Sequence, residues 1–123
     1  MVLVIDDEIH IREVIQDSLT FSGIESVGAD GGASGLALYE EHGADINVVI
    51  LDLTMPGING RETLRRLRER APTLPVILSS SIGEADLIQL TRQDRALIHL
   101  AKPFTLDTLL AAVQTAQQLH SGG

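Results

Sequence analysis

Short apolar runs rich in Val, Ile and Leu alternate with segments of helical periodicity along the whole chain. The runs cover residues 2–5, 24–29, 48–51, 76–79 and 97–101. The first and third contain only aliphatic side chains, as expected of strands buried on both faces. Helices are predicted over residues 9–21, 33–41, 61–70, 84–92 and 106–119, the last with Thr105 as its N-cap.

This alternation of strands and helices predicts an α/β fold. Parallel strands need crossover connections, and right-handed crossovers through helices place helices on both faces of the sheet. We expect a flavodoxin-like, doubly wound, five-stranded parallel sheet of order 2-1-3-4-5 with five helices. The order places the first, third and fourth strands at its centre. We expect one domain over residues 1–120, followed by a disordered tail at 121–123.

Composition and charge narrow the classes of function. The net charge is −8 and the pI is about 4.7, which disfavours direct binding to DNA or RNA because that binding depends on basic patches. The one group of basic residues alternates with leucines at helical spacing, so we interpret it as a solvated helix face. It comprises Arg61, Arg65, Arg66, Arg68 and Arg70.

Other features of the sequence bear on location and covalent chemistry. No Cys is present, which excludes disulfides, thiolate metal ligands and a Cys nucleophile. The sequence has no apolar run of the ~18 residues that a membrane span requires. It begins directly on a strand-like segment, so we expect neither a signal peptide nor membrane insertion, and a cytoplasmic location.

Polar residues follow four of the predicted strands at their carboxyl ends. Asp6, Asp7 and Glu8 follow the first strand and Asp52 follows the third, whereas the fourth ends in serines 79–81 and the fifth in Lys102. Ligands of doubly wound sheets bind beyond this edge, where the strand order reverses between strands 1 and 3. The predicted order therefore places carboxylates on both sides of the expected ligand site.

Carboxylates at this spacing favour a metal site. Negative charges held close together repel one another unless a cation joins them. Oxygen ligands without His or Cys favour a hard ion such as Mg²⁺, so we assign Asp6 and Asp7 to a metal site and Glu8 to the cap of the first helix. Lys102 is the only lysine among nine cationic residues. Its flexible ammonium can reach a carboxylate or a phosphoryl oxygen.

These residues resemble those of the two-component response-regulator receiver domain, over essentially the whole chain. The resemblance is carried by residues 4–8, by 51–57 with Gly60, by 75–80 and by 102–104. Each motif alone is weak, but four motifs in order, each at a strand end, form a specific signal. The resemblance suits a chemotaxis-type receiver, either stand-alone or part of a hybrid histidine kinase.

The resemblance implies a phosphorylation site and a metal site. Asp52 would be the phosphoacceptor. Asp7 and Asp52 would bind Mg²⁺ directly together with the backbone carbonyl of Thr54, and Asp6 would act mostly through water. Such a site supplies the in-line carboxylate and the metal that phosphoryl transfer requires.

The resemblance also implies which groups bind the phosphoryl oxygens. Ser80 would supply a hydroxyl and Lys102 an ammonium. The backbone N–H groups of Thr54 and Ser81 would complete the cradle. The side chains of Ser79 and Ser81 are expected to be bystanders, because strand alternation turns them to the opposite face from Ser80.

Some positions depart from the commonest family pattern. His99 occupies the position where the family usually has Tyr or Phe, a ring that turns inward when the Ser80 hydroxyl moves to the phosphate. Both a structural and a switching role are open for His99. If His99 switches, its smaller titratable ring would make the coupling between phosphorylation and the switch weaker or sensitive to pH. Ile82, two residues beyond Ser80, is unable to orient an attacking water, which predicts slow self-hydrolysis. The other histidines (10, 42 and 120) lack metal-ligand spacing and are expected at the surface.

The leading hypothesis is a signalling receiver that accepts phosphate from a histidine kinase or a histidine phosphotransfer protein. It would catalyse its own aspartyl phosphorylation and slow dephosphorylation rather than act as an enzyme on other substrates. The conformational change caused by phosphorylation would reach a partner through the face of helix 4, strand 5 and helix 5. Phosphorylation-dependent homodimerisation is an open option.

Two other classes of protein are weaker hypotheses. A Mg²⁺-dependent phosphatase or phosphotransferase would need a substrate pocket, a cap domain or a second acid two residues after Asp52, and the sequence offers none. A flavin or nucleotide binder would need a glycine-rich loop after the first strand, where acids stand instead.

Overall fold

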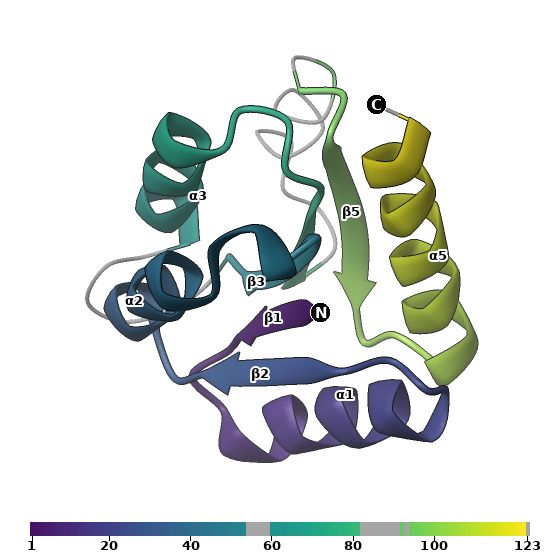
Figure 1. The fold of residues 1–123 in the computed structure, drawn as a ribbon. Coiled ribbons are helices and arrows are strands. Elements are labelled where there is room, and N and C mark those ends of the chain that lie inside the picture. Colours follow the sequence, from purple (N-terminus) through teal and green to yellow (C-terminus); the bar gives the residue numbers. More distant parts are fainter. Residues whose placement is uncertain (54–59, 82–91, 93, 123) are drawn as a thin grey trace.

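The computed structural model describes residues 1–53, 60–81, 92 and 94–122 (Figure 1). Its strands are β1 (Val2–Ile5), β2 (Ser26–Ala29), β3 (Val48–Asp52), β4 (Val76–Ser81) and β5 (Leu97–Lys102). All neighbouring strands run parallel, in the order β2-β1-β3-β4-β5. The predicted class of fold and the predicted strand order are therefore confirmed.

The described part of the chain contains four α-helices and a short 3-10 helix. They are α1 (Ile9–Phe21), α2 (Gly32–His42), η1 (Gly43–Asp45), α3 (Gly60–Arg70) and α5 (Leu106–Gly122). Apart from residue 92, the helix predicted over 84–92 lies outside the described residues. Helix α5 continues beyond its predicted end at Leu119 and takes in two residues assigned to the tail, Ser121 and Gly122. No described helix is long and apolar enough to cross a membrane.

The sheet separates two apolar layers. Alternation along β1 directs Val2 and Val4 to the layer beneath α1 and α5, and Leu3 and Ile5 to the layer beneath α2 and α3. Every residue of β1 and β3 is buried, which explains why residues 2–5 and 48–51 are continuously apolar rather than alternating. The helices contribute buried residues of matching periodicity, namely Ile15, Leu19, Leu109 and Val113 on one side and Leu36, Leu64 and Leu67 on the other.

The predicted helix caps differ in outcome. Glu8 occupies the N-cap position of α1, as predicted. Its side chain makes no capping hydrogen bond, so the prediction that this side chain caps the helix is wrong. Before α5, the backbone N–H of Thr108 donates to Thr105 Oγ1 at 3.2 Å, and the N–H of Thr105 donates to Thr108 Oγ1 at 3.0 Å. This reciprocal cap confirms the predicted helix start.

Arg68 of α3 is an anchor rather than a solvated cation. Its side chain is only 17% exposed, and its Nε lies 2.6 Å from an Asp94 carboxylate oxygen. The guanidinium also donates to the backbone carbonyls of Ala71, Leu74 and Ala96, at 3.2, 2.5 and 3.4 Å. The predicted solvated basic face is therefore wrong at Arg68. The Arg68 guanidinium thus provides hydrogen-bond donors for backbone carbonyls in the two loops that precede β4 and β5.

Other arginines of α3 form exposed ion pairs. Arg65 and Arg66 both bind Glu62, and their hydrogen bonds, that of Arg65 first, lower the pKa of Glu62 to about 2. Arg70 reaches across to Glu40 of α2 at 2.9 Å. Because these side chains are solvated, such pairs are worth little individually. These exposed ion pairs therefore contribute little to the stability of the fold.

Ser79 offers a test of packing at the centre of the sheet. Its side chain is 1% exposed, and its hydroxyl has no hydrogen-bond partner among the described residues. A buried hydroxyl without a partner costs free energy. We therefore expect Ser79→Ala to raise the free energy of unfolding by about 1 kcal/mol, measured by urea denaturation.

Ser34→Ala serves as the matched control for this measurement. The Ser34 hydroxyl is bonded to Asp30 and to the carbonyl of Gly31, so its removal should leave stability unchanged or slightly lower. A loss of stability in Ser79→Ala greater than that in Ser34→Ala would show that the Ser79 hydroxyl is satisfied in solution.

Candidate functional site

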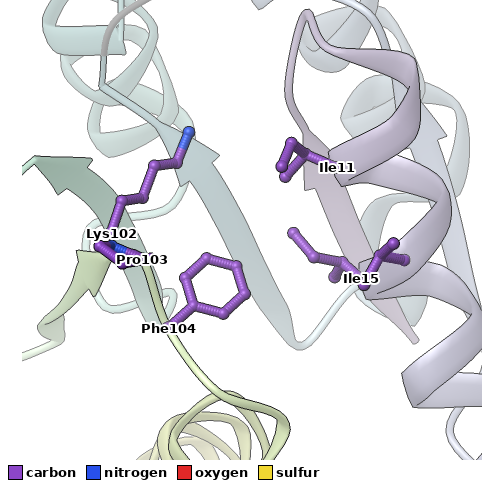
Figure 2. Close-up of a pocket in the computed structure, with 6 residues that line it drawn as sticks. Ile11, Ile15, Lys102, Pro103 and Phe104 are labelled. Atoms are coloured by element: carbon purple, nitrogen blue, oxygen red, sulfur yellow. The ribbon is translucent and has the colours of Figure 1, made fainter.

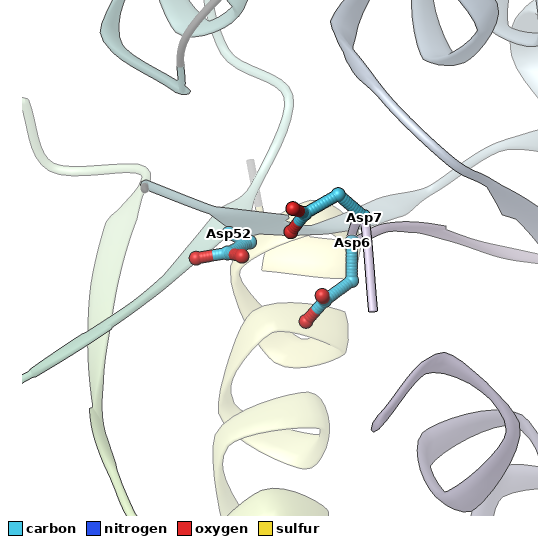
Figure 3. Close-up of side chains that lie close together, drawn as sticks. All are labelled: Asp6, Asp7 and Asp52. Carbon is cyan, nitrogen blue, oxygen red and sulfur yellow. The ribbon is translucent and has the colours of Figure 1, made fainter. Parts of the chain in front are cut away.

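Three carboxylates gather at the carboxyl edge of the central strands. Strands β1 and β3 are paired in register up to Ile5 and Leu51, so the next residues, Asp6 after β1 and Asp52 at the end of β3, lie side by side at the edge of the sheet. Ligand oxygens of Asp6, Asp7 and Asp52 all lie within 4.8 Å of one another (Figure 3). Asp6 and Asp52 are 2% and 4% exposed, whereas Asp7 is exposed. The cluster therefore has a buried floor and one side open to solvent.

Asp6 is held by backbone and side-chain hydrogen bonds. Its N–H donates to the carbonyl of Ala29 at 3.1 Å, and its Oδ1 accepts from the N–H of Glu8 at 2.9 Å. The guanidinium of Arg12 in α1 donates to the Asp6 carbonyl at 2.8 Å. Arg12 was not among the residues predicted for the site, because a surface arginine on a helix gives no sign of this contact in the sequence. These bonds fix the orientation of the acidic turn after β1.

Lys102 reaches the same carboxylates from the end of β5. Its Nζ lies 3.4 Å from Asp52 Oδ1 and 3.6 Å from Asp6 Oδ2. The lysine side chain is 25% exposed, against 5% and 3% for the two aspartates. A cation beside two buried carboxylates reduces their mutual repulsion and offers a positive charge to any anion bound there. The structure thus brings together four of the residues predicted for the site.

The chemistry of this donor set fits a hard divalent cation. Two buried carboxylates and one exposed carboxylate offer oxygen ligands only, and the exposed side leaves room for water ligands. Calcium or magnesium prefers such ligands to nitrogen or sulfur. Thr54, whose backbone carbonyl was assigned to the metal and whose N–H was assigned to the phosphoryl group, lies outside the described residues, as does Ile82.

The Ser80 hydroxyl is bonded to His99 across β4 and β5. Ser80 Oγ and His99 Nε2 lie 3.0 Å apart, and Ser80 is 1% exposed whereas His99 is exposed. The sequence suggested that these positions are coupled but did not predict a direct hydrogen bond. Ser81 ends β4 with its backbone paired to Lys102, which places it at the edge where the carboxylates lie.

Gly60 contacts the backbone at the end of β3. Its N–H donates to the carbonyl of Leu53 at 3.2 Å. A Cβ added at this position would lie 2.4 Å from Leu53 Cα and 2.6 Å from the carbonyl oxygen of Asp52. No separate role was predicted for Gly60 from the sequence. The signal was its place at the end of the turn-forming sequence Pro-Gly-Ile-Asn-Gly at residues 56–60, where close backbone approach is a common reason for glycine.

An apolar pocket of about 390 Å³ adjoins the site (Figure 2). It lies between α1 and the segment that follows β5, and its lining residues are Ile11, Val14, Ile15, Lys102, Pro103 and Phe104. The peptide bond between Lys102 and Pro103 is cis. Lys102 lines this pocket as well as contacting the carboxylates, so the pocket and the acidic cluster share one wall.

The remaining histidines do not join the site in the described part of the chain. His10 is exposed and His42 is half-buried, and the group of possible metal ligands found among the described residues contains neither. The side chain of His120 lies outside the described residues.

Comparison with known proteins gives one consistent family. The family model described as the response regulator receiver domain matches residues 2–114. Sporulation initiation phosphotransferase F of Bacillus subtilis is 32% identical over 98% of this chain and 95% of that protein. The chemotaxis protein CheY of the same organism is 31% identical over 91% of this chain and 92% of its own length.

Solved structures and longer relatives agree with this result. A response regulator receiver domain protein from Clostridium thermocellum superposes with a TM-score of 0.87 at 33% identity, covering 95% of this chain and 93% of the other. The regulatory protein AtoC of Escherichia coli is 32% identical over 98% of this chain, but the match spans only 26% of that longer protein.

Proposed function

Because this chain belongs to the response regulator receiver domain family, we propose that Asp52 accepts a phosphoryl group from a phosphohistidine donor. Receiver domains of two-component systems take phosphoryl groups from histidine kinases or phosphotransfer proteins. The observation that carries the proposal for this chain is the position of Lys102 Nζ, 3.4 Å from Asp52 Oδ1 at a buried acidic cluster. That geometry combines a carboxylate nucleophile with a fixed positive charge, as phosphoryl transfer requires.

In the proposed reaction, a carboxylate oxygen of Asp52 attacks the phosphorus in line with the phosphorus–nitrogen bond of the donor. That bond breaks, the imidazole leaves with the electron pair and takes up a proton, and Asp52 becomes an acyl phosphate. Lys102 offsets charge on the equatorial oxygens, and the Ser80 hydroxyl donates to one of them. The backbone N–H groups of Ser81 and Thr54 are proposed to complete the cradle.

We propose Mg²⁺ as the cofactor, held by Asp7 and Asp52 with the Thr54 carbonyl, and by Asp6 mostly through water. When bound, the ion would offset negative charge on the phosphoryl oxygens. This proposal is supported by the ligand oxygens of Asp6, Asp7 and Asp52, which all lie within 4.8 Å of one another, and by the exposure of Asp7 on one side of the cluster. Arg12 and the Glu8 N–H hold Asp6 in place before any ion binds.

We further propose that phosphorylation changes the face formed by residues 84–92, β5 and α5, and that a partner protein reads this change. The added phosphoryl group brings roughly −1.5 to −2 charges by analogy with phosphorylated hydroxyls. The Ser80–His99 bond supports this route, because it joins the site to the exposed edge strand β5. Neither DNA nor RNA is a proposed partner, since the chain is acidic. A phosphorylation-dependent homodimer is one form that the output could take.

The test is phosphorylation by a small donor. With Mg²⁺ and acetyl phosphate, we expect the intact mass to rise by one phosphoryl group per chain, and we expect Asp52→Asn to abolish this adduct. Asp17→Asn is the control, because Asp17 is exposed on α1 away from the cluster. An equal adduct in Asp52→Asn would refute the assignment of Asp52. Catalytic turnover of an added phosphoester would instead indicate an enzyme.

A further inference from the structure

Ser79 is a buried polar side chain to which the proposed reaction assigns no role. It is 1% exposed, and its hydroxyl has no hydrogen-bond partner among the described residues. A hydroxyl that leaves water without gaining a partner costs free energy, and such groups are rare in folded proteins. An apolar side chain would suit the packing of the sheet better, so the hydroxyl itself requires an explanation.

The register of the sheet places Ser79 beside Asp52. The two residues are Cα partners in the parallel pairing of β3 and β4, and neighbouring strands lie only about 4.8 Å apart. Ile50 and Ile77, two residues earlier on each strand, both belong to the apolar layer beneath α1 and α5. Because side chains alternate along a strand, Ser79 and Asp52 project to this same face. The alternation that turns Ser79 away from Ser80 therefore turns it to the side of Asp52.

In the structure, Lys102 is a cationic donor close to Asp52, with its Nζ 3.4 Å from Asp52 Oδ1. In the proposed reaction, this ammonium offsets charge on the equatorial oxygens of the incoming phosphoryl group, so its interaction with Asp52 weakens. Asp52 keeps part of its negative charge in a loose transition state. A buried carboxylate that loses its cation is stabilised by another donor.

The Ser79 hydroxyl can become that donor without breaking a hydrogen bond. A serine hydroxyl moves among three staggered positions by rotation about the Cα–Cβ bond. It has one hydrogen to donate, and in the structure this hydrogen has no acceptor among the described residues. A carboxylate oxygen has two lone pairs, so one oxygen of Asp52 can accept from Ser79 while it also binds Mg²⁺.

We infer that Ser79 is a positioning residue for phosphoryl transfer, and that its hydroxyl donates to the Asp52 oxygen that does not attack. This inference rests on the receiver function proposed above and adds a residue to it. A hydrogen bond to one oxygen fixes the rotation of the carboxylate, so the other oxygen faces the phosphorus. The bond is charge-assisted as long as Asp52 keeps its charge, and the hydroxyl retains its hydrogen throughout. The hydroxyl thus destabilises the resting fold and accelerates the reaction.

Ser79→Ala tests this inference through three measurements. With acetyl phosphate at saturating Mg²⁺, we expect intact-mass kinetics to show about tenfold slower phosphorylation of Asp52, typical of losing one hydrogen bond to a charged group. Urea denaturation should show that the unphosphorylated variant is more stable than the wild type. A calorimetric titration with Mg²⁺ alone should give the wild-type Kd. A residue with only a packing role would not make the protein both more stable and slower.

Two further variants separate the hydroxyl from its volume and from serine removal in general. Ser79→Cys fills the space with a thiol, which is a weak donor, so we expect it to be about as slow as Ser79→Ala. Ser18→Ala is the matched control, because the Ser18 hydroxyl donates to the Val14 carbonyl within α1. Its rate of phosphorylation should equal that of the wild type.

Several results would overturn the inference. They are a wild-type rate in Ser79→Ala, full recovery of the rate in Ser79→Cys, a resting stability of Ser79→Ala below that of the wild type, and a weaker Kd for Mg²⁺ in that variant. If the wild-type protein formed no adduct at Asp52, the proposed function itself would fail, and this inference with it. An Asp52-dependent adduct that forms at equal rates in the wild type and Ser79→Ala would overturn this inference alone.

Discussion

Replacing Lys102 with alanine is expected to lower the rate of phosphoryl transfer to Asp52 by about two to three orders of magnitude, typical of losing one preorganised charge. The same change should tighten binding of a divalent cation by about tenfold. Both effects follow from one geometry, because Nζ lies 3.4 Å from Asp52 and 3.6 Å from Asp6. Without the ammonium, the carboxylates lose their built-in counter-charge and the ion meets no like charge.

The two effects are measured separately. The rate comes from intact-mass kinetics with acetyl phosphate at saturating Mg²⁺, and the affinity from a calorimetric titration with Mg²⁺ alone. Arg70→Ala is a suitable control, since it also removes one cation but its guanidinium pairs with Glu40 of α2. If Lys102→Ala weakened both metal binding and transfer, the lysine would be acting through the stability of the site rather than through its charge.

A second large effect is expected from Gly60→Ala. The new Cβ would meet Leu53 Cα at 2.4 Å and the carbonyl oxygens of Asp52 and Leu53 at 2.6 and 2.7 Å. These are backbone atoms, so relief of the overlap requires movement of the chain that follows β3. Overpacking of this kind typically costs about 1–3 kcal/mol. We expect a loss of about 3 kcal/mol in the free energy of unfolding, together with slower phosphorylation because Asp52 is displaced.

Gly31→Ala provides the comparison for this variant. Gly31 precedes α2 with extended backbone angles, and no atom lies within 4 Å of its added Cβ. Its replacement should change the free energy of unfolding by less than about 1 kcal/mol. Chemical denaturation gives the stability and the acetyl phosphate assay gives the rate. A Gly60→Ala protein with wild-type stability and rate would show that the segment after β3 can adjust without moving Asp52.

The layers of the fold could be predicted because a strand buried on both faces appears in the sequence as a continuous apolar run. The buried positions 2–5 of β1 and 48–51 of β3 are all apolar, whereas the exposed sides of the helices are free to vary. Helix ends were harder to place. The hydrogen bonds of Thr105 and Thr108 follow a known capping pattern, but no pattern showed that Glu8 would occupy an N-cap without bonding there.

The candidate site could be predicted as far as strand ends determine it. Asp6 follows β1 and Asp52 ends the neighbouring strand β3, so topology alone brings them together. Lys102 could be assigned to the site because the sequence contains no other lysine. Contacts that depend on side-chain conformation were not accessible from the sequence. Arg12 reaches a carbonyl six residues earlier in the chain, and Arg68 turns inward among neighbouring arginines that face solvent. Helical spacing is the same for an arginine that anchors a loop and for one that does not.

The presence of a single lysine has a practical consequence. Lys102 is partly accessible and is the only side chain in the molecule that carries a primary amine. Any amine-directed reagent that modifies a side chain must therefore modify the site itself, with the N-terminal amine as the internal standard. Ligands that occupy the acidic cluster or shield Nζ would slow this labelling. The protein thus contains its own single-point reporter of site occupancy, without the introduction of a probe.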